Sequence, residues 1–89
     1  SYLNLHLRRE ELTRKTEQLF SDTGFGKILR VKGFFEEDGI WQQFNATKDQ
    51  ILIAPVPENR AALIVIGSDL NEDAIGVLMT GKPPEHHIL

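Results

Sequence analysis

The sequence predicts an α+β domain, in which a mostly antiparallel sheet of four to five strands carries two helices on one face. Three observations support this fold class. Short apolar or alternating segments typical of strands recur along the chain, two longer segments repeat their apolar residues with the period of a helix, and Gly, Pro and Asp separate them. The elements follow the order β-α-β-β-β-β-α. A chain of 89 residues has room for one such domain with a single core.

The first strand and the first helix are predicted near the N-terminus. Residues Tyr2–Leu7 alternate leucines with polar or aromatic residues, which is the period of a half-buried strand. From about Arg9 the period becomes helical, and the residues expected on the buried face are Leu12, Thr16, Leu19 and Phe20. No good N-cap residue precedes this helix. Thr23-Gly24 can end it, with Gly24 expected in the left-handed conformation.

A hairpin is predicted in the middle of the chain. Residues Ile28–Phe35 form its first strand, with Leu29, Val31, Gly33 and Phe35 on one face and Ile28, Arg30, Lys32 and Phe34 on the other. Asp38-Gly39 supplies the turn because both residues tolerate positive φ. Residues Ile40–Ala46 form the antiparallel partner strand.

Two further strands and a second helix complete the predicted order. Residues Gln50–Ala54 form a short strand that ends before Pro55 and Pro57. Residues Ala61–Gly67 are almost continuously apolar, which indicates a central strand covered on both faces.

The last helix is expected to begin after Asn71, a good N-cap, and to end at Gly81. Its buried stripe comprises Ile75, Leu78 and Met79. We therefore expect one domain over residues 1–81 and a flexible tail over residues 82–89.

Composition narrows the function classes. The chain has no cysteine, which excludes disulfides, thiolate metal sites and thiol nucleophiles, and suits a cytoplasmic protein. No stretch approaches the roughly 18 apolar residues of a membrane helix, so no membrane partner is expected. The formal net charge of −3 disfavours nonspecific nucleic-acid binding, because that binding needs Lys and Arg to neutralise phosphates.

Two sequence motifs carry a resemblance to a known family. The first is Gly26-Lys27-Ile28-Leu29-Arg30-Val31-Lys32-Gly33-Phe34-Phe35. The second is the apolar run Ala62–Ile66 followed by Gly67-Ser68-Asp69-Leu70-Asn71-Glu72. In this order, with a hairpin between them, they resemble the C-terminal domain of CobW-type GTPases. The similarity spans roughly Tyr2 to Met79. Trp41 alone stands where that domain often has a tryptophan-rich passage, and interior histidine tracts are missing.

The resemblance implies a role as a non-catalytic accessory domain. CobW-type proteins are P-loop GTPases proposed to deliver metals such as zinc or cobalt, in some cases for cobalamin metabolism. The resemblance therefore implies GTP, Mg and a transition metal such as Zn for a full-length protein, with a metal-receiving client as partner. This chain has no Gly-x-x-x-x-Gly-Lys-Ser/Thr loop, and its Gly24–Lys27 segment follows a helix, the reverse of the P-loop context. We expect no cofactor and no catalysis in this chain, whose partner would be its own N-terminal GTPase domain.

The candidate interaction residues follow from strand alternation. Arg30, Lys32 and Phe34 share the sheet face that the helices leave uncovered, and aromatic and Arg side chains are enriched where interfaces carry their binding energy. Tyr2, His6 and Trp41 are predicted to add to this face. The competing interpretations are that Arg30 and Lys32 are solvated charges lying along the sheet by their stems, and that Trp41 packs in the core or at an edge.

Metal binding and catalysis find weaker support. His6 stands alone, whereas a structural zinc site needs four ligands. His86 and His87 are weak candidates for a metal contact shared with a partner. The carboxylates of residues 36–38 are expected at the hairpin tip, where water solvates them and no pocket separates their pKa values for acid–base catalysis.

A different function class remains as an alternative. Lys32-Gly33-Phe34 is similar to the opening of an aromatic RNA-binding motif used by four-stranded α+β domains, which suggests a small single-stranded RNA binder. The match stops at Phe35, and Glu36 and Glu37 then place negative charge where phosphates would lie.

Overall fold

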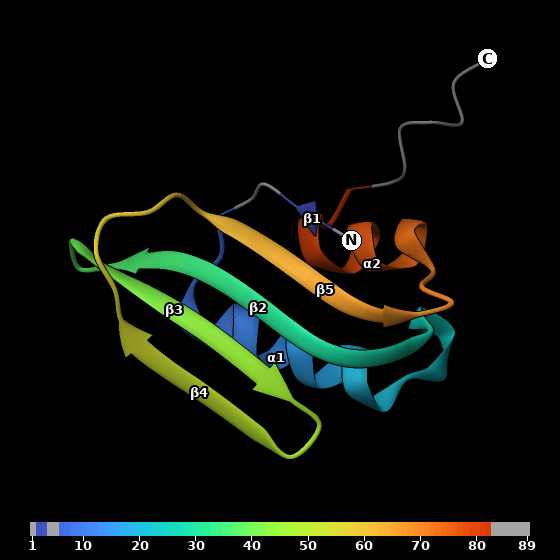
Figure 1. Cartoon of the computed structure of the whole chain (residues 1–89). Coiled ribbons are helices and arrows are strands. Elements are labelled where there is room, and N and C mark those ends of the chain that lie inside the picture. Colours follow the sequence, from blue (N-terminus) through green and yellow to red (C-terminus); the bar gives the residue numbers. More distant parts are fainter. Residues whose placement is uncertain (1, 4–5, 83–89) are drawn as a thin grey trace.

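The computed structural model describes residues 2–3 and 6–82 of the chain. Its elements are β1 (Tyr2–Leu3), α1 (Arg9–Ser21), the 3-10 turn η1 (Thr23–Phe25), β2 (Lys27–Glu37), β3 (Ile40–Thr47), β4 (Gln50–Pro55), β5 (Ala62–Ser68) and α2 (Glu72–Thr80). The strands form one antiparallel sheet in the spatial order β1-β5-β2-β3-β4 (Figure 1). The predicted α+β class and element order are confirmed.

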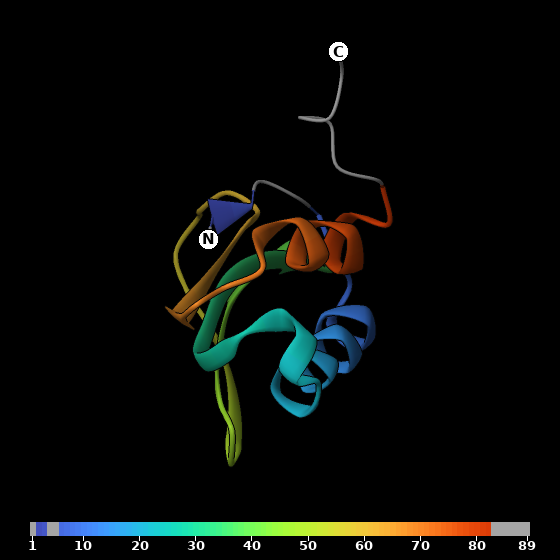
Figure 2. The ribbon, with the colours of Figure 1, turned by 90° about the vertical axis from the view of Figure 1, so that its right-hand side faces the viewer.

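Both helices lie on one side of the sheet. Turned by 90°, the molecule shows two layers, with α1 and α2 on one side of the strands and no described element on the other (Figure 2). The core lies between these layers and is built around the fully buried side chains of Phe44, Leu19, Leu63, Ile75 and Met79. Apolar burial of this kind is the main favourable term in folding, so the helix layer and the covered face of the sheet stabilise each other.

Helix α1 begins where the change of period predicts, at Arg9. Its N-cap, Arg8, makes no side-chain capping bond, as expected. Leu12, Thr16 and Leu19 are buried as predicted. The predicted end of the helix is wrong in detail, because Ser21 ends α1 and Gly24 belongs to η1, whereas the positive φ of 101° falls on Gly26. The side chain of Asp22 accepts a hydrogen bond from the Gly24 amide at 2.8 Å and holds this tight turn instead.

Strand β1 is shorter than predicted. Alternation predicted a strand over Tyr2–Leu7, but only Tyr2 and Leu3 pair with β5 among the described residues. His6 and Leu7 lie outside the strand, and the predicted strand residues between them and Leu3 fall outside the described part of the chain. Leu7 nevertheless packs against the core, just before α1 begins.

A β-bulge in β2 corrects the predicted face of Leu29. Ile28 pairs with Gly67 and Arg30 with Ile66, so one step along β5 matches two steps along β2. The additional residue on the bulged strand is Leu29, whose side chain remains 53% exposed, while Ile28 packs against the core. Beyond the bulge the predicted alternation holds, and Val31 and Phe35 point into the core. Period-two reasoning does not reveal a bulge, since the extra residue leaves no signature in hydrophobicity.

The predicted hairpin turn is confirmed. Glu37 pairs with Ile40 across the two-residue turn Asp38-Gly39, whose φ angles are 54° and 81°. Positive φ at both positions is the geometry of a type I′ turn, which fits the twist of two antiparallel strands. The hairpin of β2 and β3 therefore forms as the sequence indicates.

Strand β5 departs from its prediction on one face. Leu63 and Val65 are buried beneath the helices, but Ile66 on the opposite face is 42% exposed and Ile64 is half-buried. The expectation that both faces of this strand are covered is therefore wrong for the described chain. The helices cover only one face of the sheet. Because β5 is apolar on both of its faces, its apolar side chains on the uncovered face remain exposed to solvent.

The two motifs that carry the family resemblance meet where the sheet joins α2. Gly26, at the start of the first motif, lies so close to the backbone of Asp69 and Leu70 that a Cβ atom would not fit. The amide of Asn71 donates to the carbonyl of Phe25 at 3.0 Å. Asn71 also caps α2 as predicted, because its Oδ1 accepts a hydrogen bond from the Ala74 amide at 3.1 Å. Gly81 ends α2 in the left-handed conformation, also as predicted.

Candidate interaction surface

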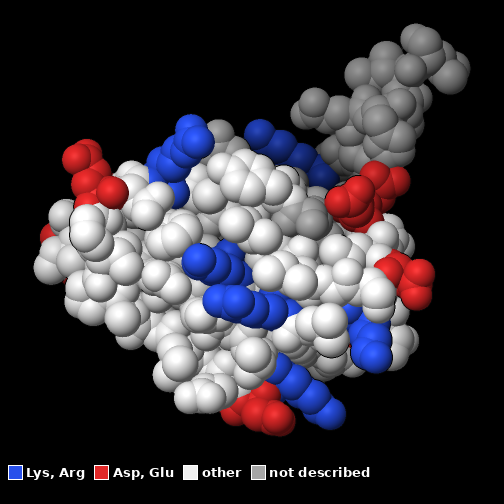
Figure 3. Space-filling model, viewed as in Figure 1, with Lys and Arg blue, Asp and Glu red and all other residues white. Residues whose placement is uncertain are grey.

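The uncovered side of the sheet forms one continuous surface, which we call the open face. Strand alternation and the pairing registers assign its members, which are Tyr2, Lys27, Arg30, Lys32, Phe34, Glu36, Trp41, Gln43, Asn45, Thr47, Gln50, Leu52, Ala54, Ala62, Ile64, Ile66 and Ser68. Figure 3 views this side of the molecule: basic side chains cross a largely uncharged middle, and acidic side chains lie toward the outline.

One row of paired residues crosses all five strands on the open face. Tyr2 pairs with Ile64, Ile64 with Lys32, Lys32 with Asn45, and Asn45 with Leu52. Lys32 therefore stands in the centre of the row, and an exposed apolar or aromatic side chain stands at each edge. Tyr2 and Leu52 are each 56% exposed. The row therefore combines one charge with exposed apolar and aromatic side chains.

Arg30 and Lys32 are held by uncharged partners. The Arg30 Nε atom donates to Asn45 Oδ1 at 2.9 Å, and Lys32 Nζ lies 5.6 Å from the centroid of the Phe34 ring. The ion pairs of the described residues involve other cations, namely Arg9 and Lys15. The open face thus presents two positioned positive charges without a carboxylate of its own chain bound to either.

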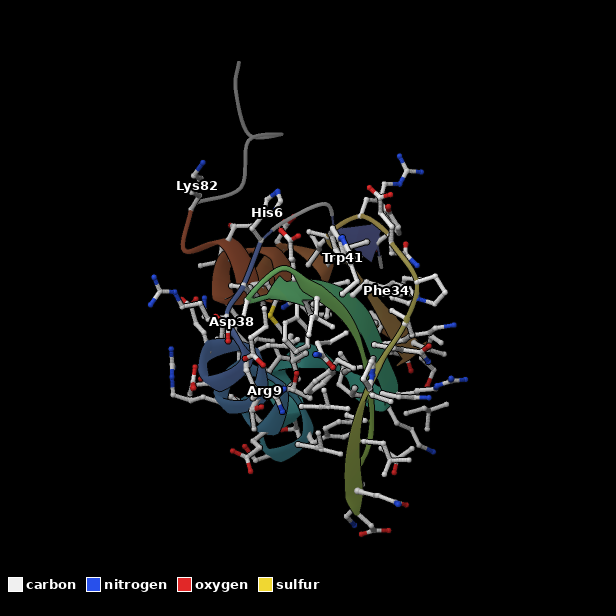
Figure 4. The ribbon with its side chains drawn as sticks, turned by 90° about the vertical axis from the view of Figure 1, so that its left-hand side faces the viewer. His6, Arg9, Phe34, Asp38, Trp41 and Lys82 are labelled. Atoms are coloured by element: carbon white, nitrogen blue, oxygen red, sulfur yellow. The ribbon has the colours of Figure 1, made fainter. Side chains whose placement is uncertain are left out.

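The aromatic members of the open face differ in their surroundings. Phe34 is half-buried beneath Lys32, and Trp41, also half-buried, pairs in register with Glu36 close to the hairpin turn. Trp41 is therefore a face residue and does not belong to the buried core. Figure 4 shows the sheet from its edge, with Phe34 toward the open side.

His6 does not join the other predicted residues. It lies on the side of the helices in Figure 4, beside a surface hollow of about 320 Å³ that is also lined by Arg8, Glu11, Phe35 and Glu36. The prediction placed it on a strand through Tyr2–Leu7, and the early end of β1 removes it from the alternation. The structure brings together five of the six predicted residues on the open face and places the sixth, His6, at the rim of the sheet.

One carboxylate at the hairpin tip has a partner that sequence reasoning missed. Arg9 forms a bidentate ion pair with Glu37, with Nη2 to Oε1 at 2.7 Å and Nε to Oε2 at 3.0 Å. The hydrogen bonds from Arg9 lower the pKa of Glu37, and the same pairing raises the pKa of Arg9. A carboxylate held ionised in this way is a poor proton donor, so it gives no support to acid–base catalysis. Arg9 and Glu37 are 28 positions apart in the sequence, so a search for local sequence patterns does not detect this ion pair.

A second hollow, also missed by sequence reasoning, lies between α1 and the turn from β3 to β4. Its volume is about 510 Å³, and Thr16, Phe20, Thr47 and Ile51 contribute to its walls. The hydroxyl of Thr16 is buried and has no hydrogen-bond partner among the described residues. Because that oxygen is itself inaccessible to solvent, the hollow does not present it to a ligand.

Metal and membrane sites find no counterpart in the described chain. Residues 2–3 and 6–82 contain no group of three or more His, Cys, Asp and Glu residues arranged to hold a metal ion. His86 and His87 lie outside the described residues. Within the same ranges, no helix combines the length and the apolar character that crossing a bilayer requires.

The fold and its exposed surface define a class of protein: a two-layer α+β domain whose antiparallel sheet is covered by helices on one face only. A family model described as the cobalamin synthesis protein cobW C-terminal domain matches residues 4–80. The chain belongs to this family, which confirms the resemblance carried by the two motifs.

Solved structures show the same fold in a longer protein. The Zn(II)-bound YjiA GTPase from E. coli superposes with a TM-score of 0.65 at 22% sequence identity, over 91% of this chain and 27% of that chain. A Zn(II)-bound triple mutant of YjiA GTPase gives a TM-score of 0.66 at 23% identity over the same shares. This chain thus spans about a quarter of the YjiA chain. No curated protein matches.

Proposed function

We propose that this chain is a non-catalytic accessory domain that binds through its open face to the GTPase domain of a CobW-type protein. The observation that carries the proposal is the apolar character of β5 on both faces, because the helices cover Leu63 and Val65 while Ile66 stays 42% exposed. Tyr2 and Leu52 add exposed apolar and aromatic area at the two edges of the same face. The family membership and the fold shared with one part of the YjiA GTPase support the choice of partner.

The domain would act by binding two states of its partner unequally. A GTPase domain alternates between GDP-bound and GTP-bound forms, and a bound domain shifts that equilibrium only by its difference in affinity for the two. Contact by the open face in one form and its release in the other would expose the same surface to a metal-receiving client. In this way the nucleotide state would be coupled to delivery of a metal such as zinc.

GTP, Mg and the delivered metal are assigned to the partner domain. The described residues of this chain contain no His, Cys, Asp and Glu cluster that fits a metal ion. We propose that the contribution of this chain is binding and orientation. We propose a cytoplasmic location for the assembled protein, which agrees with the absence of cysteine from this sequence.

Calorimetric titration tests this function. The chain is titrated into the GTPase domain of its own full-length protein, loaded in parallel with GDP and with a non-hydrolysable GTP analogue. We expect binding to both forms with unequal affinity, and Leu52→Asp or Ile66→Asp to weaken it. Equal affinity for the two forms would refute coupling, and absence of binding to either would refute the accessory role.

The open face gives less support to single-stranded RNA binding. Stacking with a base needs a free aromatic face, but the Phe34 ring is covered by Lys32 at 5.6 Å from its centroid. Trp41 is paired in register with Glu36, whose charge repels phosphate. Single-stranded RNA binding therefore stays a prediction that rests only on the sequence motif Lys32-Gly33-Phe34.

A further inference from the structure

Two cations lie side by side in the middle of the open face. Arg30 and Lys32 are separated by one residue on β2, so their side chains leave the same face about 7 Å apart. Neither is paired with a carboxylate among the described residues, and each has a neutral partner, Asn45 or Phe34. Like charges on neighbouring side chains repel each other, and an anion between them would relieve that repulsion.

The surroundings of these cations increase the strength of such a contact. Across β5, Arg30 pairs with Ile66 and Lys32 with Ile64, and the row through Lys32 ends at Leu52. A partner lying on these side chains would exclude water from the charges. Because the Coulomb interaction grows as the effective dielectric constant falls, a carboxylate brought in with apolar neighbours would bind more strongly than one in open water.

The charge of the open face is opposite to that of the whole chain. The sequence contains 13 acidic and 10 basic residues, yet the middle of this face carries Arg30 and Lys32, and the acidic residue Glu36 lies next to the turn of the β2–β3 hairpin. An acidic partner would be repelled by most of the domain and attracted here. Charge complementarity therefore selects both the partner and the place at which it docks.

We propose that the open face binds an acidic and apolar protein segment, and that an Asp or Glu side chain of this segment inserts between Arg30 and Lys32. Asn45 acts as a positioning residue, since its bond to Arg30 Nε leaves the terminal nitrogens of the guanidinium to meet the carboxylate. This inference rests on the proposed function and names the chemistry of its partner. Two cations flanked by aliphatic side chains fit a protein carboxylate better than a nucleic acid, which needs many phosphate contacts.

The experiment uses a defined probe in addition to the GTPase domain. An acetylated and amidated peptide with two glutamates between leucines is titrated into the 15N-labelled chain, and the same peptide with glutamines serves as the neutral control. We expect chemical-shift changes at Arg30, Lys32 and their neighbours on the open face, about tenfold weaker binding of the glutamine peptide, and loss of affinity as salt rises from about 0.05 to 0.5 M.

Matched variants separate a specific site from general charge. The double variant R30E/K32E is expected to lose at least about tenfold in affinity for the glutamate peptide. The double variant R14E/K48E makes the same change in net charge at two exposed positions off the open face, and is expected to bind like the parent chain. Equal losses in the two variants, or equal binding of the two peptides, would overturn the inference. Tighter binding of an RNA oligonucleotide than of the glutamate peptide would also overturn it.

The outcomes distinguish this inference from the proposed function. If R30E/K32E binds the GTPase domain as well as the parent chain does, the carboxylate receptor is refuted and the accessory role stands. If the parent chain binds the glutamate peptide on the open face but neither nucleotide form of the GTPase domain, the accessory role is refuted and the receptor stands. Failure to bind both refutes both.

Discussion

The two faces of one sheet use the same strands for different purposes. On the covered face, Phe44, Val31 and Leu63 are at most 1% exposed beneath the helices. On the open face, the alternating positions of the same strands carry Asn45, Lys32 and Ile64. The covered face therefore determines stability, whereas the open face is free to determine what the domain binds. Matched substitutions on the two faces test whether the covered face determines stability and the open face determines binding.

The largest expected effect is on the covered face. Phe44→Ala removes a fully buried ring from the middle of the sheet, and such truncations cost about 3–5 kcal/mol because a cavity remains. Leu52→Ala is the matched change on the open face, where the side chain is already 56% exposed, and should cost less than about 1 kcal/mol. Urea unfolding measures both. Similar losses in the two variants would mean that the open face also supports the fold.

The junction between the sheet and α2 should be the next most sensitive. Gly26→Ala combines a φ of 101° with a Cβ placed against the backbone of Asp69 and Leu70, so we expect a loss of at least about 2 kcal/mol. Gly76 on α2 has no atom within 4 Å of the position that a methyl group would take, and Gly76→Ala should instead stabilise by about 0.5–1 kcal/mol. Thermal unfolding of both variants should therefore shift in opposite directions. A gain in stability for Gly26→Ala would contradict the close approach of the two motifs.

A buried lysine links the two helices of the covering layer by a hydrogen bond. Lys15 on α1 is 9% exposed, and its Nζ donates to the carbonyl of Met79 in the last turn of α2 at 3.1 Å. Lys15→Met keeps the apolar stem but leaves that carbonyl unpaired, which should cost about 1–3 kcal/mol. Arg14→Met changes the exposed neighbour on the same helix and should be nearly neutral. Urea unfolding of the two variants measures this difference. Equal losses of stability in Lys15→Met and Arg14→Met would argue that the Lys15–Met79 hydrogen bond does not stabilise the helix layer.

The sequence predicted the covered face better than the open one, for a physical reason. Burial imposes a period on residues such as Leu12, Leu19 and Ile75, and turn geometry restricts Asp38-Gly39, so both leave readable patterns. Arg9 and Glu37 are joined only by folding, and nothing local indicates the pair.

The same limit applies to the open face. Strand alternation grouped Arg30, Lys32 and Phe34 correctly, because these residues belong to one strand. It failed for His6, whose place depends on where β1 stops pairing, and for Leu29, which a bulge displaces. The continuous apolar run of β5 predicts that both faces of the strand are buried. One of those faces is instead exposed at Ile66 and belongs to the candidate binding surface.

The smallest expected effect depends on pH and again separates the two faces. Glu37 lies on the covered side and is paired with Arg9, which lowers the pKa of Glu37 below its ordinary value of 4.5. A carboxylate with a lowered pKa in the folded state stabilises the fold above its unfolded pKa, and this contribution is lost as the pH falls through the folded pKa. Glu37→Gln should therefore reduce stability slightly at neutral pH, and the difference from the parent chain should shrink below about pH 4.5.

Glu36→Gln is the matched control for this prediction, because Glu36 is the neighbouring exposed residue on the other face. Urea unfolding across this pH range should show a pH-dependent difference for Glu37→Gln and little for Glu36→Gln. If both variants have the same stability as the parent chain at every pH, solvent screening has removed the stabilising effect of the Arg9–Glu37 ion pair. Apolar packing and the Lys15 hydrogen bond would then stabilise the covered side without a contribution from that pair.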